Sequence, residues 1–154
     1  QSLLINVGRE DDVAVGNPVM SSEGLVGHVI RIGESSSRVL KLEDLNSRIA
    51  VMSLPRESRA ILSGDNTQRP KLSFVSDSAD WRDGDVVITS GDDGMLPQGL
   101  VIGKAMLDTQ GELRVRLNTT AKPIDWVWVS PFKPVLAPTE GEAISGDIKT
   151  EGGE

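Results

Sequence analysis

The sequence contains no cysteine and no tyrosine, and its only aromatic side chains are three tryptophans and two phenylalanines. The missing cysteines exclude a disulfide framework and thiol chemistry. Because aromatic residues are so few, a core must be built from valine, isoleucine and leucine. No apolar run approaches the ~18 residues of a membrane-spanning helix, and no signal peptide is visible. The chain starts directly in strand-like sequence, as a fragment of a longer protein would.

Basic residues are also in the minority, because the net charge is −7. Residues 135–154 account for −4 of this charge, so the rest of the chain is nearly neutral. The sequence shows no basic stripe of the kind that nucleic-acid phosphates require, and we expect no nucleic-acid partner. Proline, glycine and acidic residues without periodicity predict a disordered acidic tail over residues 135–154.

What the sequence does contain is a series of short β-branched runs separated by Gly, Pro, Asn and Asp. Leu113, Val115 and Leu117 alternate with two arginines, which is the period of a half-buried strand. No segment sustains the apolar spacing of an amphipathic helix for three turns. The pattern therefore predicts an all-β fold of about ten to twelve short strands.

A weak internal repeat organises these strands. Residues 15–27 recur in residues 83–103, and residues 38–53 recur in residues 114–130. Six short strands with glycine corners in each copy predict two small six-stranded β-barrels in tandem, because closure removes exposed sheet edges. We expect the first barrel over residues 1–66 and the second over 67–134, with the last strands free to return and pack on the first.

Three segments then resemble known sequence. Residues 7–44 resemble the first conserved stretch of the MreC family of rod shape-determining proteins. The run from Trp81 to Gly91 resembles its GD-V-TSG stretch, and the run from Gly94 to Gly103 resembles the glycine-rich loop that follows it. The resemblance covers about residues 3–134. It implies a periplasmic part of two small β-barrels, anchored in the bacterial inner membrane by an N-terminal helix upstream of this chain.

The same resemblance implies a function without catalysis. Members of this family act as scaffolds of the cell-elongation complex, so the expected partners are a class B penicillin-binding transpeptidase, MreD and other rod-complex proteins. It also implies self-association into a homo-oligomer or filament, and no cofactor. The matching positions are structural turns rather than reactive groups, namely Gly24, Gly27, Gly91, Gly94, Gly99 and Gly103. We expect them where hairpins need a positive φ or where strands bend.

A chymotrypsin-like or other cell-wall hydrolase is the alternative, because tandem six-stranded barrels also describe serine proteases. His28 is the only histidine, with Asp44 and Ser90 as the nearest approach to its partners in a triad. However, Asp93 stands where the Gly-Asp-Ser-Gly nucleophile motif needs serine. His28 also shares parity with apolar strand residues, so we interpret it as structural. One histidine without cysteine cannot supply a usual zinc site, and we expect no metal.

A scaffold acts through its surfaces, and three candidates emerge. Trp126 and Trp128 share one face of a strand, so they are exposed or meet a neighbouring domain if Val127 and Val129 face the core; the alternative is that both tryptophans fill the barrel–barrel junction. The second candidate is the loop of Met95, Leu96 and Pro97, which either anchors a partner or packs over the barrel mouth. The third is the uncovered edge of any incomplete barrel.

Overall fold

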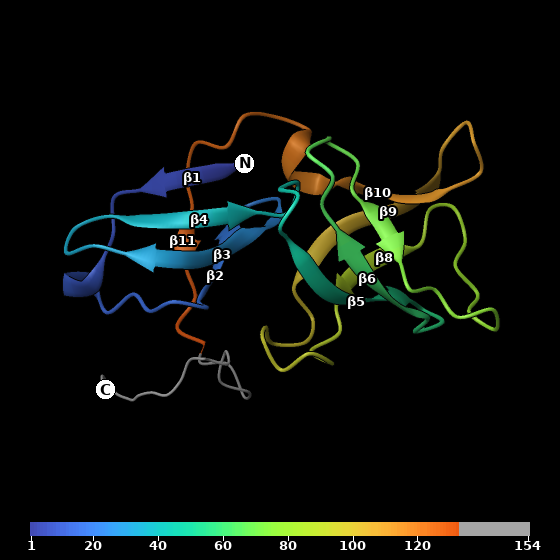
Figure 1. Cartoon of the computed structure of the whole chain (residues 1–154), viewed down its shortest axis with the longest axis horizontal. Helices are drawn as coiled ribbons and strands as arrows, with labels where there is room; N and C mark the ends of the chain where they lie inside the picture. Colours follow the sequence, from blue (N-terminus) through green and yellow to red (C-terminus); the bar gives the residue numbers. More distant parts are fainter. Residues whose placement is uncertain (133–154) are drawn as a thin grey trace.

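The computed structural model describes residues 1–132, and this part of the protein is built from strands (Figure 1). It contains two three-residue 3₁₀ turns and no α-helix, and no helix in it has the length and apolar character of a membrane span. The turns are η1 (Arg9–Asp11) and η2 (Asn118–Thr120). The strands are β1 (Ser2–Ile5), β2 (Pro18–Ser21), β3 (Gly24–Ile32), β4 (Ser37–Lys41), β5 (Arg48–Leu54), β6 (Arg59–Ser63), β7 (Lys71–Ser73), β8 (Val86–Thr89), β9 (Val101–Leu107), β10 (Leu113–Leu117) and β11 (Trp128–Val129). The all-β prediction is confirmed.

Five strands form an antiparallel sheet in the order β1-β4-β3-β2-β11, which we call the sheet lobe. Its core consists of β-branched side chains, namely Ile5, Val19, Val26, Val29 and Val39 from the strands and Val13 from the segment before β2. Within residues 1–132, neither β1 nor β11 pairs with a further strand, so both outer edges of this sheet are open.

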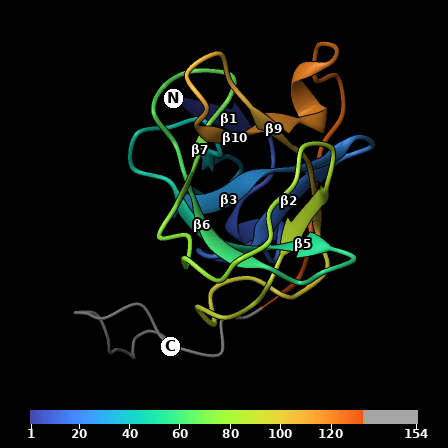
Figure 2. The same ribbon diagram turned by 90° about the vertical axis from the view of Figure 1, so that its right-hand side faces the viewer.

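The other six strands close into a barrel in the order β10-β7-β6-β5-β8-β9, which we call the barrel lobe. Figure 2 looks at the molecule from the barrel end and shows these strands wrapped around one another in front of the sheet lobe. The interior is aliphatic, as the scarcity of aromatic residues requires. Its fully buried members include Val51, Leu62, Val87, Ile102 and Val115.

The chain divides between the lobes at a different place from the one expected. We expected a boundary at residue 66, but β5 and β6 precede that residue and belong to the closed barrel. The division therefore lies between β4 and β5. Only one of the two expected barrels closes within the described residues. In the barrel lobe, β6 lies between β5 and β7 and closes the ring, whereas no described strand lies between β11 and β1 in the sheet lobe. The tail expected over residues 135–154 lies outside the described residues.

The internal repeat has a structural counterpart, since β2–β3–β4 and β8–β9–β10 follow the same plan. Val19 pairs with Gly27, and Val87 pairs with Gly103, and a register shift follows each of these pairs. The strand after each copy then crosses to the other copy. β5 pairs with β8, whereas β11 returns to pair with β2. The two halves thus exchange a strand, which ties the lobes together.

Gly27 and Gly103 occupy equivalent positions where two strands approach too closely for a side chain. A Cβ on Gly27 would collide with the carbonyl oxygen of Leu40, and one on Gly103 with that of Arg116. Glycine is therefore required at both sites by close packing of the backbone. The remaining turn glycines have positive φ values instead, namely Gly24, Gly91, Gly94 and Gly99.

The lobes share a continuous apolar junction. Leu25 and Leu42, from the sheet lobe, are fully buried within the same cluster as the barrel interior. The turn between β2 and β3 also packs closely on β9, because a Cβ on Gly24 would lie 2.6 Å from the carbonyl oxygen of Val101. The position of the sheet lobe on the barrel is therefore set by buried contacts.

Candidate interaction surface

The tryptophans near the end of the described chain lie on the surface. Val127 and Val129 pack on the core of the sheet lobe, so strand alternation directs Trp126 and Trp128 to the other face. Trp126 is 84% exposed and Trp128 is 53% exposed. Of the two alternatives left by the sequence pattern, the structure selects exposure over filling of the junction between the lobes.

Trp128, but not Trp126, lines a cavity of about 430 Å³. It is lined by apolar side chains from two distant segments, and we call the part formed by Val7, Val13, Val127, Trp128 and Val129 the β11 groove. Asp11 and Asp12 stand at its rim and are both exposed. An apolar floor with an acidic rim suits a partner segment that carries apolar residues flanked by basic ones.

A buried asparagine fixes β11 beside this groove. The Asn17 side-chain amide donates to the carbonyl oxygen of Phe132 at 2.7 Å and accepts from the backbone N–H of Ala14 at 2.9 Å. The N–H of Ser130 donates to the carbonyl oxygen of Pro18 at 2.9 Å. Because Asn17 is only 3% exposed, these bonds form in a region of low dielectric and hold the groove in one shape.

The loop between β8 and β9 does not present Leu96 at an exposed tip. Leu96 is buried in the barrel cluster, at 4% exposure, and Met95 and Pro97 are half-buried. The hydroxyl of Thr89 donates to the carbonyl oxygen of Pro97 at 2.6 Å. Of the two alternatives that the sequence left open for this loop, the structure shows Leu96 packed against the barrel core, and a partner contact through Met95 and Pro97 stays a prediction.

His28 lies in a small cavity between the lobes, which is lined by Gly16, His28, Arg48, Ile49, Asp93, Met95 and Leu96. Burial lowers the pKa of His28, although the nearby Asp93 carboxylate opposes this shift. Nδ1 has no hydrogen-bond partner within the described residues. The carboxylate of Asp93 instead accepts from the N–H groups of Ala50 and Met95.

This cavity does not assemble a hydrolytic site. It contains a histidine and a carboxylate but no serine among the residues that line it. Asp44, the carboxylate considered for a triad, instead accepts from the N–H of Asn46 in the turn before β5. Among residues 1–132 there is no group of three or more His, Asp or Glu side chains placed to hold a metal ion.

Sequence reasoning singled out Trp128, which lines the groove, but missed the other wall. Val7 and Val13 lie more than 110 positions before β11 and come from an irregular segment without strand periodicity. Only the pairing of β11 with β2 brings these segments together. No local signal in the sequence predicts such a long-range contact.

Comparison with known proteins places this fold in a family. Residues 1–130 match the family model described as "Rod shape-determining protein MreC, barrel core". Cell shape-determining protein MreC of Caulobacter vibrioides is 42% identical over 130 residues, which are 84% of this chain and 38% of the relative. The protein of the same name from Cereibacter sphaeroides is 43% identical over 117 residues, or 76% of this chain and 39% of the relative. The chain thus spans about two fifths of the length of these relatives.

Solved structures show the same arrangement. The crystal structure of MreC from Pseudomonas aeruginosa has a TM-score of 0.71 and 28% identity, covering 84% of this chain and 88% of that one. A structure of the major periplasmic domain from the cell shape-determining filament MreC has a TM-score of 0.70 and 23% identity, with coverage of 82% and 84%.

A third structure is a complex between penicillin-binding protein PBP2 and MreC from Helicobacter pylori. Its TM-score is 0.54 and its identity is 18%, with coverage of 73% of this chain and 74% of that one, so it supports the fold alone. The relatives named here are cell shape-determining proteins rather than enzymes. On the family match and the identity to these relatives, this chain belongs to the MreC family.

Proposed function

We propose that this chain is the partner-binding part of a non-enzymatic periplasmic scaffold that maintains cell shape by binding proteins of peptidoglycan synthesis. A class B penicillin-binding transpeptidase is the partner that docks on the β11 groove. The observation that carries this assignment is the exposed Trp128, which lines an apolar groove at an open sheet edge. The existence of a PBP2–MreC complex in Helicobacter pylori supports a partner of this class.

The groove offers three contributions to binding at one place. Its valine floor can accept apolar side chains, and the tryptophans supply the large flat surfaces that dominate many interfaces. β11 can also pair with an extended segment of the partner through its open edge. By preferring one conformation of the transpeptidase, a scaffold of this kind regulates wall synthesis without chemistry of its own.

The wider proposal keeps the features that the family resemblance implies. It includes MreD and other rod-complex proteins as partners, self-association, and an N-terminal helix that anchors the protein in the inner membrane. One structural relative is described as a cell shape-determining filament, which supports self-association. The hydrolase alternative has no comparable support, because no serine lines the cavity that holds the only histidine.

The test is the affinity of the chain for the periplasmic part of a class B transpeptidase, measured for Trp128→Ala and Trp126→Ala. Loss of a buried tryptophan contact is expected to cost on the order of 2 kcal/mol, which is about thirtyfold in Kd. Both side chains are already largely exposed, so thermal stability should hardly change.

Phe74→Ala is the matched control, since Phe74 is an 83% exposed aromatic residue on the loop after β7 and does not line the groove. This control should bind like the unmodified chain. Equal affinity of the unmodified chain, both tryptophan variants and the control would remove the β11 groove from the proposal.

A further inference from the structure

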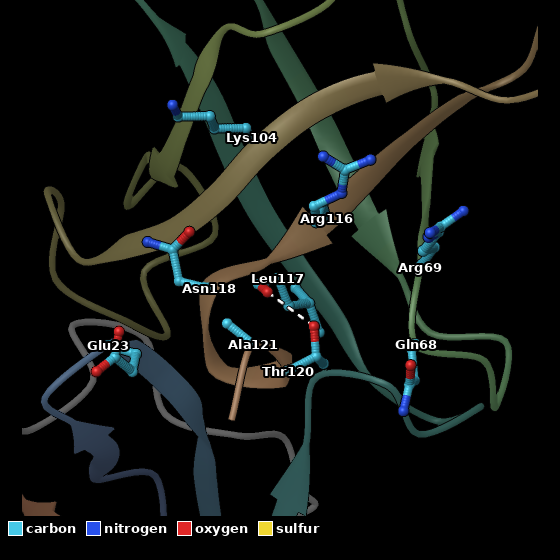
Figure 3. Close-up of a pocket in the computed structure, with 9 residues that line it drawn as sticks. All are labelled: Glu23, Gln68, Arg69, Lys104, Arg116, Leu117, Asn118, Thr120 and Ala121. Carbon is cyan, nitrogen blue, oxygen red and sulfur yellow. Dashed lines mark hydrogen bonds between the residues drawn. The ribbon is translucent and has the colours of Figure 1, made fainter. Parts of the chain in front are cut away.

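Three basic side chains form a row on the outer wall of the barrel lobe, beside η2 (Figure 3). Lys104 on β9 and Arg116 on β10 are direct cross-strand partners. The N–H of Val115 donates to the carbonyl oxygen of Pro70 at 2.9 Å, and this pairing places the preceding Arg69 next to Arg116. We call Arg69, Arg116 and Lys104 the basic row.

The basic row is not neutralised by any acid in residues 1–132. By contrast, Arg114, which lies two positions before Arg116 on the same face of β10, forms ion pairs with three carboxylates: Asp65 at 2.8 Å, Asp108 at 2.9 Å and Glu112 at 3.5 Å. No ion pair is formed by Arg69, Lys104 or Arg116 among these residues. Like charges placed opposite one another on neighbouring strands destabilise a sheet, and a bound anion would relieve this repulsion.

The row borders a cavity of about 400 Å³, which is a size typical of binding sites. The amides of Gln68 and Asn118 also line it and provide neutral donors and acceptors (Figure 3). Glu23 lies on the side of the sheet lobe, but its carboxylate pairs with Lys122 at 3.1 Å. Glu23 is the one acid among the residues that line this cavity, and its pairing with Lys122 leaves the cations of the row available.

The cavity extends along the molecule. A second cavity of about 520 Å³ shares Gln68, Thr120 and Ala121 with it and reaches the sheet lobe, where Lys41 and Glu43 line it and pair with each other at 3.7 Å. An elongated groove with cations at one end suits an extended ligand better than a compact ion. The guanidinium groups of Arg69 and Arg116 can each bind a carboxylate in bidentate fashion, and the amides match a peptide backbone.

We propose that this groove is a second binding site, which takes an extended polypeptide segment rich in carboxylates from another protein. The chain's own acidic residues, 140–154, have the right charge. However, the described chain lines the groove only as far as Ile124 and then crosses the strands of the sheet lobe to β11, which lines neither cavity (Figure 1). The chain's own acidic residues would have to turn back from β11 to reach the basic row, whereas an acidic segment of another protein reaches it directly. The site is separate from the β11 groove, because the two sets of lining residues do not overlap.

The experiment measures binding of a fluorescently labelled hexaglutamate peptide to the whole chain by anisotropy at low salt. Arg116→Ala and Lys104→Ala should each weaken binding at least tenfold, because a charged hydrogen-bonded contact is lost. Arg31→Ala is the matched control. Arg31 is an exposed cation on β3 that makes no ion pair within the described residues and lies outside the cavity, so its loss should leave the affinity unchanged.

Thermal unfolding of Arg116→Ala should be unchanged or slightly raised, since one repulsive charge is gone. A hexaglutamine peptide that binds as tightly as hexaglutamate would overturn the proposal, as would an equal loss of affinity in Arg31→Ala. Displacement of hexaglutamate by an equimolar amount of inorganic phosphate would also overturn it, in favour of a site for a single compact anion.

A further arm tests the source of the acidic segment. It uses a variant that replaces five acidic residues by the corresponding amides, namely Glu140, Glu142, Asp147, Glu151 and Glu154. Unchanged affinity for hexaglutamate supports a segment from another protein. Tighter binding by this variant would show that the chain's own acidic residues compete for the groove, contrary to the assignment. Neither result depends on the transpeptidase interaction, because no transpeptidase is present in the assay.

Discussion

Replacement of Leu96 by alanine separates a core role from a partner-contact role. Leu96 is 4% exposed and belongs to the barrel cluster, although it comes from the loop between β8 and β9. The change removes three carbon atoms, worth about 0.8 kcal/mol each, and leaves a cavity that adds to this cost. Because buried leucine-to-alanine changes cost about 2–5 kcal/mol, we expect a loss of about 3 kcal/mol in the free energy of unfolding.

The assay is urea and thermal unfolding followed by intrinsic fluorescence. For a domain of this size a loss of about 3 kcal/mol lowers the midpoint of thermal unfolding by roughly 6–12 °C. Leu107→Ala is the matched control, because this leucine on β9 is 52% exposed, and its change should stay within about 0.5 kcal/mol. If Leu96→Ala were as stable as Leu107→Ala, Leu96 would not pack in the barrel and the reasoning would be refuted.

Two further predictions concern a pair of glycines and the buried histidine. Gly27→Ala and Gly103→Ala should both destabilise the fold by more than 2 kcal/mol in urea unfolding, because a Cβ meets a strand carbonyl at each site. Gly111→Ala, where a Cβ meets nothing within 4 Å and only the positive φ opposes it, should cost about 1 kcal/mol; equal losses at all three sites would contradict this account. For His28, burial lowers the pKa in the folded state below 6.5, so the unfolded chain takes up a proton first as pH falls. The stability that neutral His28 provides is therefore present above about pH 6.5 and lost below it. The difference in unfolding free energy between pH 7.5 and pH 5.5 should therefore be smaller in His28→Gln than in the unmodified chain. An unchanged difference would show that another group causes it.

The sequence was informative about local structure and weak on long-range pairing. Strand alternation at Leu113–Leu117 and the turn chemistry of the glycines predict the elements, because both are properties of a few adjacent residues. The boundary at residue 66 was wrong because β5 leaves its own half of the repeat and pairs with β8. Such an exchange of strands leaves no trace in the local pattern.

The candidate sites show the same limit. Parity placed Trp126 and Trp128 on one face but left open which face is buried, and only the packing of Val127 and Val129 decides it. Arg69, Lys104 and Arg116 are separated by 35 and 12 positions in a chain of net charge −7, so their cluster is invisible until β7, β9 and β10 are aligned. A charge count over the whole sequence averages such a row away.

The central claim, that a wall-synthesis partner docks on the β11 groove, is tested most directly by amide hydrogen exchange of the chain with and without a class B transpeptidase domain. Residues 126–131, together with residues 7–13 across the groove, are expected to exchange more slowly in the complex, because the partner covers them and pairs with the open edge of β11. Slower exchange confined to other surfaces, with these two segments unchanged, would contradict the claim.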